Sequence, residues 1–245
     1  MNTLLEIVIW GHVVAGFTGL AAFWVPVFAR KGGQMHVRFG RIYTYCAYIV
    51  TLSAIAVSVG RIAQYQQQGI SIVNEPARYG FAIFLGYLGI TTFTSVRHAV
   101  RVVRTRKMPG QLRTPFHTSL AWTTIVASLV VIVAAFAIWS PLSVILLSLS
   151  PVGVLVGMGI LNFMNRGAAE HMGWFYSHMG SMIGGGIAFH TAFAVFGAQR
   201  LFEYSIEGPL AVVPWILPAL IGIPAIILAR RYYQRRFVRP QVQTA

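Results

Sequence analysis

The sequence predicts an all-α protein, a polytopic bundle of seven transmembrane helices, and three observations support that prediction. Hydrophobic residues make up 56% of the 245 residues and charged residues only 10%, against about a quarter in an ordinary soluble domain. The mean hydropathy is +0.67. Seven separate segments are long enough to cross roughly 30 Å of hydrocarbon at about 1.5 Å per residue. Together these observations exclude a water-soluble globular domain.

The seven segments follow one another closely, so we expect the whole chain, 1–245, to form a single transmembrane domain. Each segment is an apolar run of about 20 residues with few charges. Their expected bounds are about 4–29, 42–60, 79–100, 116–138, 141–164, 172–198 and 209–230. The longest break, 61–78, is rich in glutamine, and we expect it to be an ordered surface connector or a short interfacial helix.

Local features justify the segments in order. The first segment lacks the basic residues with which a signal peptide begins, and its apolar run is longer than the apolar core of a signal peptide. We therefore expect it to remain uncleaved. It also carries small residues at helical spacing around His12, a face that lets another helix or a flat cofactor approach closely. Ser140-Pro141 leaves room only for a tight hairpin between the fourth and fifth segments, and Pro151 predicts a kink in the fifth.

The sixth and seventh segments carry the strongest backbone signals. Small residues recur in the sixth at four-residue steps, which favours close helix packing; they are Gly180, Gly184, Ala188 and Ala192. The seventh contains three prolines, which predict a kinked helix.

The positive charges predict the orientation. Of the 19 lysines and arginines, 16 lie in the odd-numbered connectors or the C-terminal tail, and only Arg61, Arg78 and Arg200 lie in even-numbered connectors. Since positive residues remain on the cytoplasmic side, we expect the N-terminus outside and the C-terminus in the cytoplasm of a bacterium with the chain in its inner membrane. The same clusters fit anionic lipid headgroups better than nucleic acid.

Histidine is the only well-supplied ligand type. The chain has no aspartate and five glutamates, and its single cysteine, Cys46, excludes an intramolecular disulfide and any cysteine-built metal centre. Seven histidines remain, most of them in or beside the apolar segments. Ionisable groups there are costly, so they are the candidates for function.

Depth along the segments suggests b-type haem as a cofactor. Counting from the segment centres, His12 and His190 lie at matching outer depths, whereas His178, His98 and His117 lie on the inner side. Neutral imidazole is a natural ligand of haem iron. The first hypothesis is therefore a membrane redox component with His12 and His190 as outer ligands, and His178 with His98 or His117 as inner ligands. Its partner would be a quinone or a redox protein.

Two other hypotheses stay open. A metal site of a membrane enzyme or transporter would use the inner histidines His98, His117, His171 and His178, with His36 and Glu170 as additional candidates. Alternatively, the histidines only join helices, and the protein is a small-solute transporter or a membrane sensor without a prosthetic group. Histidine could then relay a proton.

Two motifs resemble an uncharacterised bacterial family of small polytopic membrane proteins. The first is the connector Lys31-Gly32-Gly33 to His36 and Gly40-Arg41-Ile42-Tyr43, preceded by His12; the second runs from His171 through His178 to His190. Val37 departs from that pattern, in which a basic residue often follows the histidine. The resemblance implies a bundle of about seven spans with a histidine in the first, and it implies no reaction.

Overall fold

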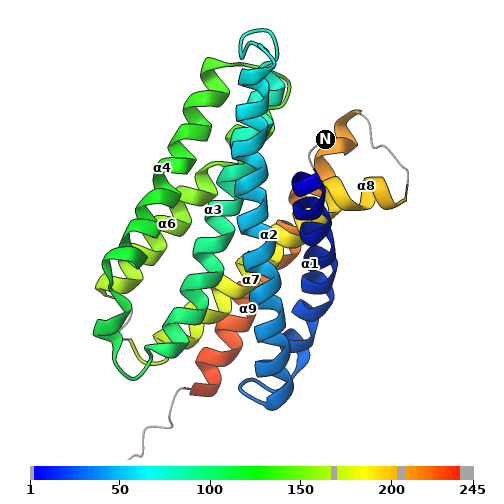
Figure 1. Cartoon of the computed structure of the whole chain (residues 1–245). Helices are drawn as coiled ribbons and strands as arrows, with labels where there is room; N and C mark the ends of the chain where they lie inside the picture. The colour runs from blue at the N-terminus through cyan, green and yellow to red at the C-terminus, as the bar shows by residue number, and fades with distance from the viewer. Residues whose placement is uncertain (1–2, 167–169, 203–207, 238–245) are drawn as a thin grey trace, which may run out of the picture.

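The computed structural model describes residues 3–166, 170–202 and 208–237 (Figure 1). Within these ranges every regular element is helical, with no strand. Seven of the helical segments are long and apolar enough to cross a membrane. The prediction of an all-helical chain with seven helices long and apolar enough to cross a membrane is therefore confirmed.

The first half of the chain forms four long helices. They are α1 (Thr3–Phe28), α2 (Gln34–Gln67), α3 (Pro76–Arg104) and α4 (Pro115–Ala137), with a short 3-10 turn, η1 (Pro109–Leu112), before α4. The second half is more broken. It comprises α5 (Ser143–Leu149), α6 (Pro151–Asn165), α7 (Gly173–Ala192), a π-helical turn η3 (Phe193–Gly197), α8 (Ala198–Leu201), a 3-10 turn η4 (Gly208–Val212) and α9 (Val213–Phe237).

Proline sets the start of three helices. Pro76, Pro115 and Pro151 each lie in the first turn of their helix, where the missing N–H costs nothing and the fixed φ is already helical. Before Pro115, the hydroxyl of Thr114 accepts the backbone N–H of His117 and caps α4. This cap matters for the site because it fixes the turn that carries His117.

The second helix is longer than the sequence predicted. It covers 34 residues, or about 51 Å at 1.5 Å per residue, which exceeds the hydrocarbon thickness. We expected the glutamine-rich stretch to lie in the connector 61–78. Instead it continues α2 as far as Gln67, because glutamine is a good helix former. Tyr79 holds this extension, since its hydroxyl receives a hydrogen bond from Gln66 and donates one to Ile70.

Helix α3 lies at the centre of the bundle and packs against α2, α4, α6 and α7. One apolar core joins α1, α2, α3 and α7, and a second joins α3, α4 and α5. Many large apolar side chains face outward instead, among them Trp10, Phe136 and Leu155. Such an exposed apolar surface is expected where lipid, not water, surrounds the helices.

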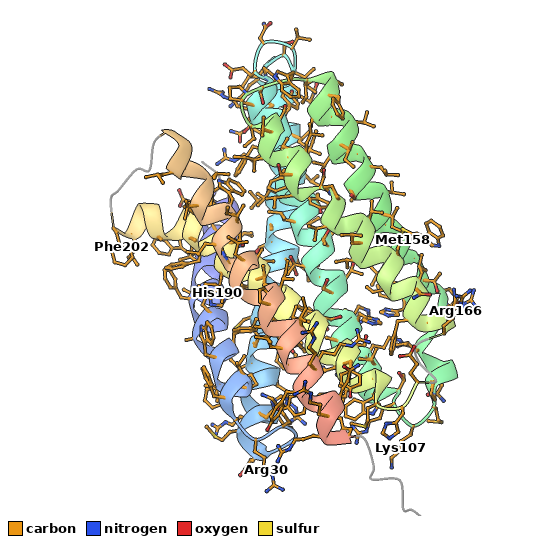
Figure 2. The ribbon with its side chains drawn as sticks, turned by 180° about the vertical axis from the view of Figure 1, so that it is seen from behind. Arg30, Lys107, Met158, Arg166, His190 and Phe202 are labelled. Atoms are coloured by element: carbon orange, nitrogen blue, oxygen red, sulfur yellow. The ribbon has the colours of Figure 1, made fainter. Side chains whose placement is uncertain are left out.

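The positively charged connectors lie together. The connector between α1 and α2, the connector between α3 and α4, and the C-terminal end of α9 occupy one end of the bundle, opposite the connector 68–75 (Figure 1). Arg30 and Lys107 mark this end in Figure 2. We call it the basic end.

Candidate functional site: two histidine pairs near the basic end

Four of the seven histidines form two pairs near the basic end. His98 lies close to the end of α3, and His117 lies in the first turn of α4. His36 lies in the first turn of α2, and His178 lies in the second turn of α7. Each pair therefore joins two helices at the point where they enter or leave the basic end.

The first pair is buried and hydrogen-bonded. Nδ1 of His98 lies 3.0 Å from Nε2 of His117, and the two ring planes are within 6° of parallel. Nε2 of His98 lies 2.8 Å from Oγ of Ser177 on α7. His98 is 2% exposed and His117 is fully buried. Three helices thus contribute one continuous line of polar atoms inside an apolar bundle.

The second pair has a defined tautomer. Nδ1 of His36 lies 3.1 Å from the carbonyl oxygen of Pro26, and Nδ1 of His178 lies 2.9 Å from that of Ala99. Because a carbonyl only accepts, each Nδ1 must carry the hydrogen. In the neutral rings, Nε2 then bears a lone pair, and it has no hydrogen-bond partner among the described residues. The two ring centres are 6.3 Å apart.

Lys31 lies beside this second pair. Its ammonium donates to the carbonyl oxygens of Pro26 at 2.9 Å and Val27 at 2.6 Å, so it caps the C-terminal end of α1. Pro26 also receives the hydrogen bond of His36. Burial lowers the pKa of Lys31 below its ordinary value of 10.5. A lysine, rather than a carboxylate, is thus the charged neighbour of the pair.

The two histidines expected to share an outer site are not brought together. Nδ1 of His12 contacts Oγ of Ser53 on α2 at 2.8 Å. His190 instead accepts the indole N–H of Trp24 and donates to the carbonyl oxygen of Gly186. Trp24 lies twelve residues from His12, about 18 Å along α1. Because α7 runs obliquely, His190 lies about half-way between the two ends of the bundle (Figure 2).

The alternative metal site does not assemble as a cluster. Among the described residues, no group of three or more histidine, cysteine, aspartate or glutamate side chains lies close enough to hold a metal ion. His171 and Glu170 are exposed in the connector before α7, while His98 and His117 bond to each other. Of the three predicted inner histidines that lie on helices, His178 is the one whose Nε2 has no hydrogen-bond partner among the described residues.

Two of the contributors, Ser177 and Lys31, were not predicted as site residues from the sequence. His36 was predicted only as an additional ligand of the alternative metal site. A signal was present, because Lys31 and His36 both belong to the connector motif, and Ser177 directly precedes His178. What the sequence could not show is that the connector folds back over the last turn of α1.

Comparison with protein-family models, with curated proteins and with solved structures found no match. The chemistry of the two pairs is therefore the basis for the function proposed below.

Proposed function

We propose that this protein is a membrane redox component that binds a b-type haem between His36 and His178, near the basic end. The observation behind this proposal is the arrangement of the second pair. Both imidazoles present an Nε2 lone pair while a backbone carbonyl holds each Nδ1–H.

The donor chemistry of the pair suits haem iron. Neutral imidazole is its common axial ligand, and a carbonyl bound to the other ring nitrogen fixes the tautomer and the ring orientation. The two ring centres lie 6.3 Å apart, so both imidazoles would be close enough to hold one iron-bearing group.

The surroundings also suit an anionic group. Lys31 supplies a positive charge beside the pair, and such charges complement the two carboxylates that b-type haem carries. Bound haem would supply one-electron transfer. The chain itself holds the two rings and fixes their tautomer.

We further infer the setting of this site. By the positive-inside rule, the basic end faces the cytoplasm of a bacterium and the N-terminus lies outside, with the protein in the inner membrane. The lipid bilayer is then its first partner, and anionic headgroups lie against the basic connectors. A quinone or a redox protein would exchange the electron.

The test is a reduced-minus-oxidised absorbance spectrum of the protein purified in mild detergent, with metal analysis of the same sample. We expect a low-spin haem spectrum that is lost in both His36→Ala and His178→Ala, because each variant removes one ligand. His171→Ala is the matched control, since His171 is exposed in the connector before α7, and it should retain the spectrum.

The variants His12→Ala and His190→Ala decide between this proposal and the outer site expected from the sequence. We expect both to keep the spectrum. Its loss in both, with His36→Ala unaffected, would move the haem to His12 and His190. A folded, colourless and iron-free protein, even after expression with added haem precursor, would refute the redox proposal and favour a transporter or sensor without a prosthetic group.

A further inference from the structure

A line of three polar side chains crosses from α7 through α3 to α4. Oγ of Ser177 is 2.8 Å from Nε2 of His98, and Nδ1 of His98 is 3.0 Å from Nε2 of His117. Every step has hydrogen-bond distance, and the two rings are almost parallel. His98 uses both ring nitrogens, so it can receive a proton on one side and release one on the other.

Two arrangements of hydrogens satisfy this line equally well. In the first, Ser177 donates to His98, which donates to His117, and the free Nδ1 of His117 carries a hydrogen. In the second, His117 donates to His98, His98 donates to Ser177, and the free Nδ1 of His117 is bare. Both imidazoles are neutral in either arrangement, which avoids the cost of a buried charge in an apolar bundle.

The end of the line at His117 is incomplete. Nδ1 of His117 is buried and has no hydrogen-bond partner among the described residues. Buried polar atoms nearly always have a partner, protein or ordered water. The atom lies in the first turn of α4, directly after the connector at the basic end. An unpaired ring nitrogen in this place indicates an exchange point for a proton-bearing partner such as water.

The environment favours proton passage over proton storage. The ring of Phe163 packs edge-on against His98, with ring centres 5.6 Å apart. Arg97 lies over the ring of Phe116, the residue before His117, and Arg101 donates to carbonyl oxygens of the connector before α4. These like charges disfavour a lasting positive charge on the line. The contacts of the line select neither arrangement of hydrogens, because each bond can be made in either direction.

We propose that His117, His98 and Ser177 form a proton wire in the half of the bundle nearest the basic end. A proton binds Nδ1 of His117, the hydrogen on Nε2 of His117 passes to Nδ1 of His98, and the hydrogen on Nε2 of His98 passes to Oγ of Ser177. Ser177 then passes its original hydrogen to a water molecule, so one proton enters, one leaves, and no net charge remains. The wire requires no metal and does not rest on the haem proposal.

The test is solid-state NMR of the protein in lipid bilayers, prepared without haem and labelled with ¹⁵N in histidine. We expect the nitrogens of His98 and His117 to exchange between protonated and bare states. Ser177→Ala removes the exit, so the exchange should slow by about tenfold or more, the rate equivalent of losing roughly one hydrogen bond. Ser181→Ala, one turn further along α7, is the matched control and should leave the exchange unchanged.

Each other outcome would overturn the wire. A single fixed tautomer for both rings in the unmodified protein would show a structural link. Exchange that Ser177→Ala and Ser181→Ala affect equally would show that Ser177 is not the exit. The NMR signals of the two histidines should be assigned with His117→Asn, because His98→Ala could disturb folding. The helix content of each variant should be measured to check that the seven spans still form.

Discussion

At the scale of single residues, the structure separates buried polar groups that hold the bundle from those that do not. Tyr87 is 2% exposed, and its hydroxyl donates toward the carbonyl oxygens of Leu149 and Ser150 and accepts the N–H of Gly153. It thereby joins α3 to the break between α5 and α6. Tyr43 is equally buried, yet its hydroxyl has no hydrogen-bond partner among the described residues.

The two tyrosines provide a matched pair of substitutions. Tyr87→Phe removes the hydrogen bonds between the hydroxyl and the backbone of Leu149, Ser150 and Gly153, and should cost about 1–3 kcal/mol of stability. Tyr43→Phe removes a group that gains nothing from burial, so it should change stability by less than about 0.5 kcal/mol or raise it. The buried Cys46 is the native reporter, because unfolding exposes its thiol to a fluorogenic maleimide. Equal losses in both variants would contradict this account.

At the scale of helices, contacts between α1 and α7 depend on glycine. A Cβ on Gly186 would overlap the ring of Phe23, which is itself packed against Tyr43 and His190. A Cβ on Gly184, two residues earlier, would meet nothing within 4 Å. The four-residue glycine pattern predicted close packing, but Gly184, which belongs to it, is open, and Gly186 makes the contact.

Gly186→Ala should therefore destabilise the protein by about 1–3 kcal/mol, the usual cost of overpacking a core. Gly184→Ala should be neutral or stabilising by up to about 1 kcal/mol, because alanine is the better helix former. The same Cys46 labelling on heating measures both. A Gly184→Ala protein that unfolds as early as Gly186→Ala would show that the open side of α7 is occupied in the membrane.

The helices also show which parts of the fold and of the candidate site could be predicted from the sequence. Apolar runs predicted all seven spans, because hydropathy depends on composition alone. They could not predict that α2 extends to Gln67, since a helix beyond the membrane carries no apolar signal. Depth counting grouped His98 and His117 usefully, but it treats helices as upright. It therefore paired His12 with His190 and left His36 as an additional candidate, because the position of His36 depends on the fold of the connector over α1.

At the scale of the whole molecule, both histidine pairs lie near one end, so their roles depend on which side of the membrane that end faces. The basic end carries the connectors around Arg30 and Lys107 (Figure 2). Among the described residues, the one ion pair joins Glu75, at the end of the opposite connector, to Arg78 in the first turn of α3, and both side chains are about half exposed. This charge asymmetry predicts a cytoplasmic basic end.

Single-cysteine labelling in intact cells tests the orientation. With Cys46 changed to serine, Val73→Cys places a thiol at the exposed connector opposite the basic end, and Gly110→Cys places one in the connector at the basic end. A membrane-impermeant maleimide should label Val73→Cys in intact cells and Gly110→Cys only after permeabilisation. The reverse pattern would invert the bundle, so that His117 would take up protons from outside and the His36–His178 pair would exchange electrons there.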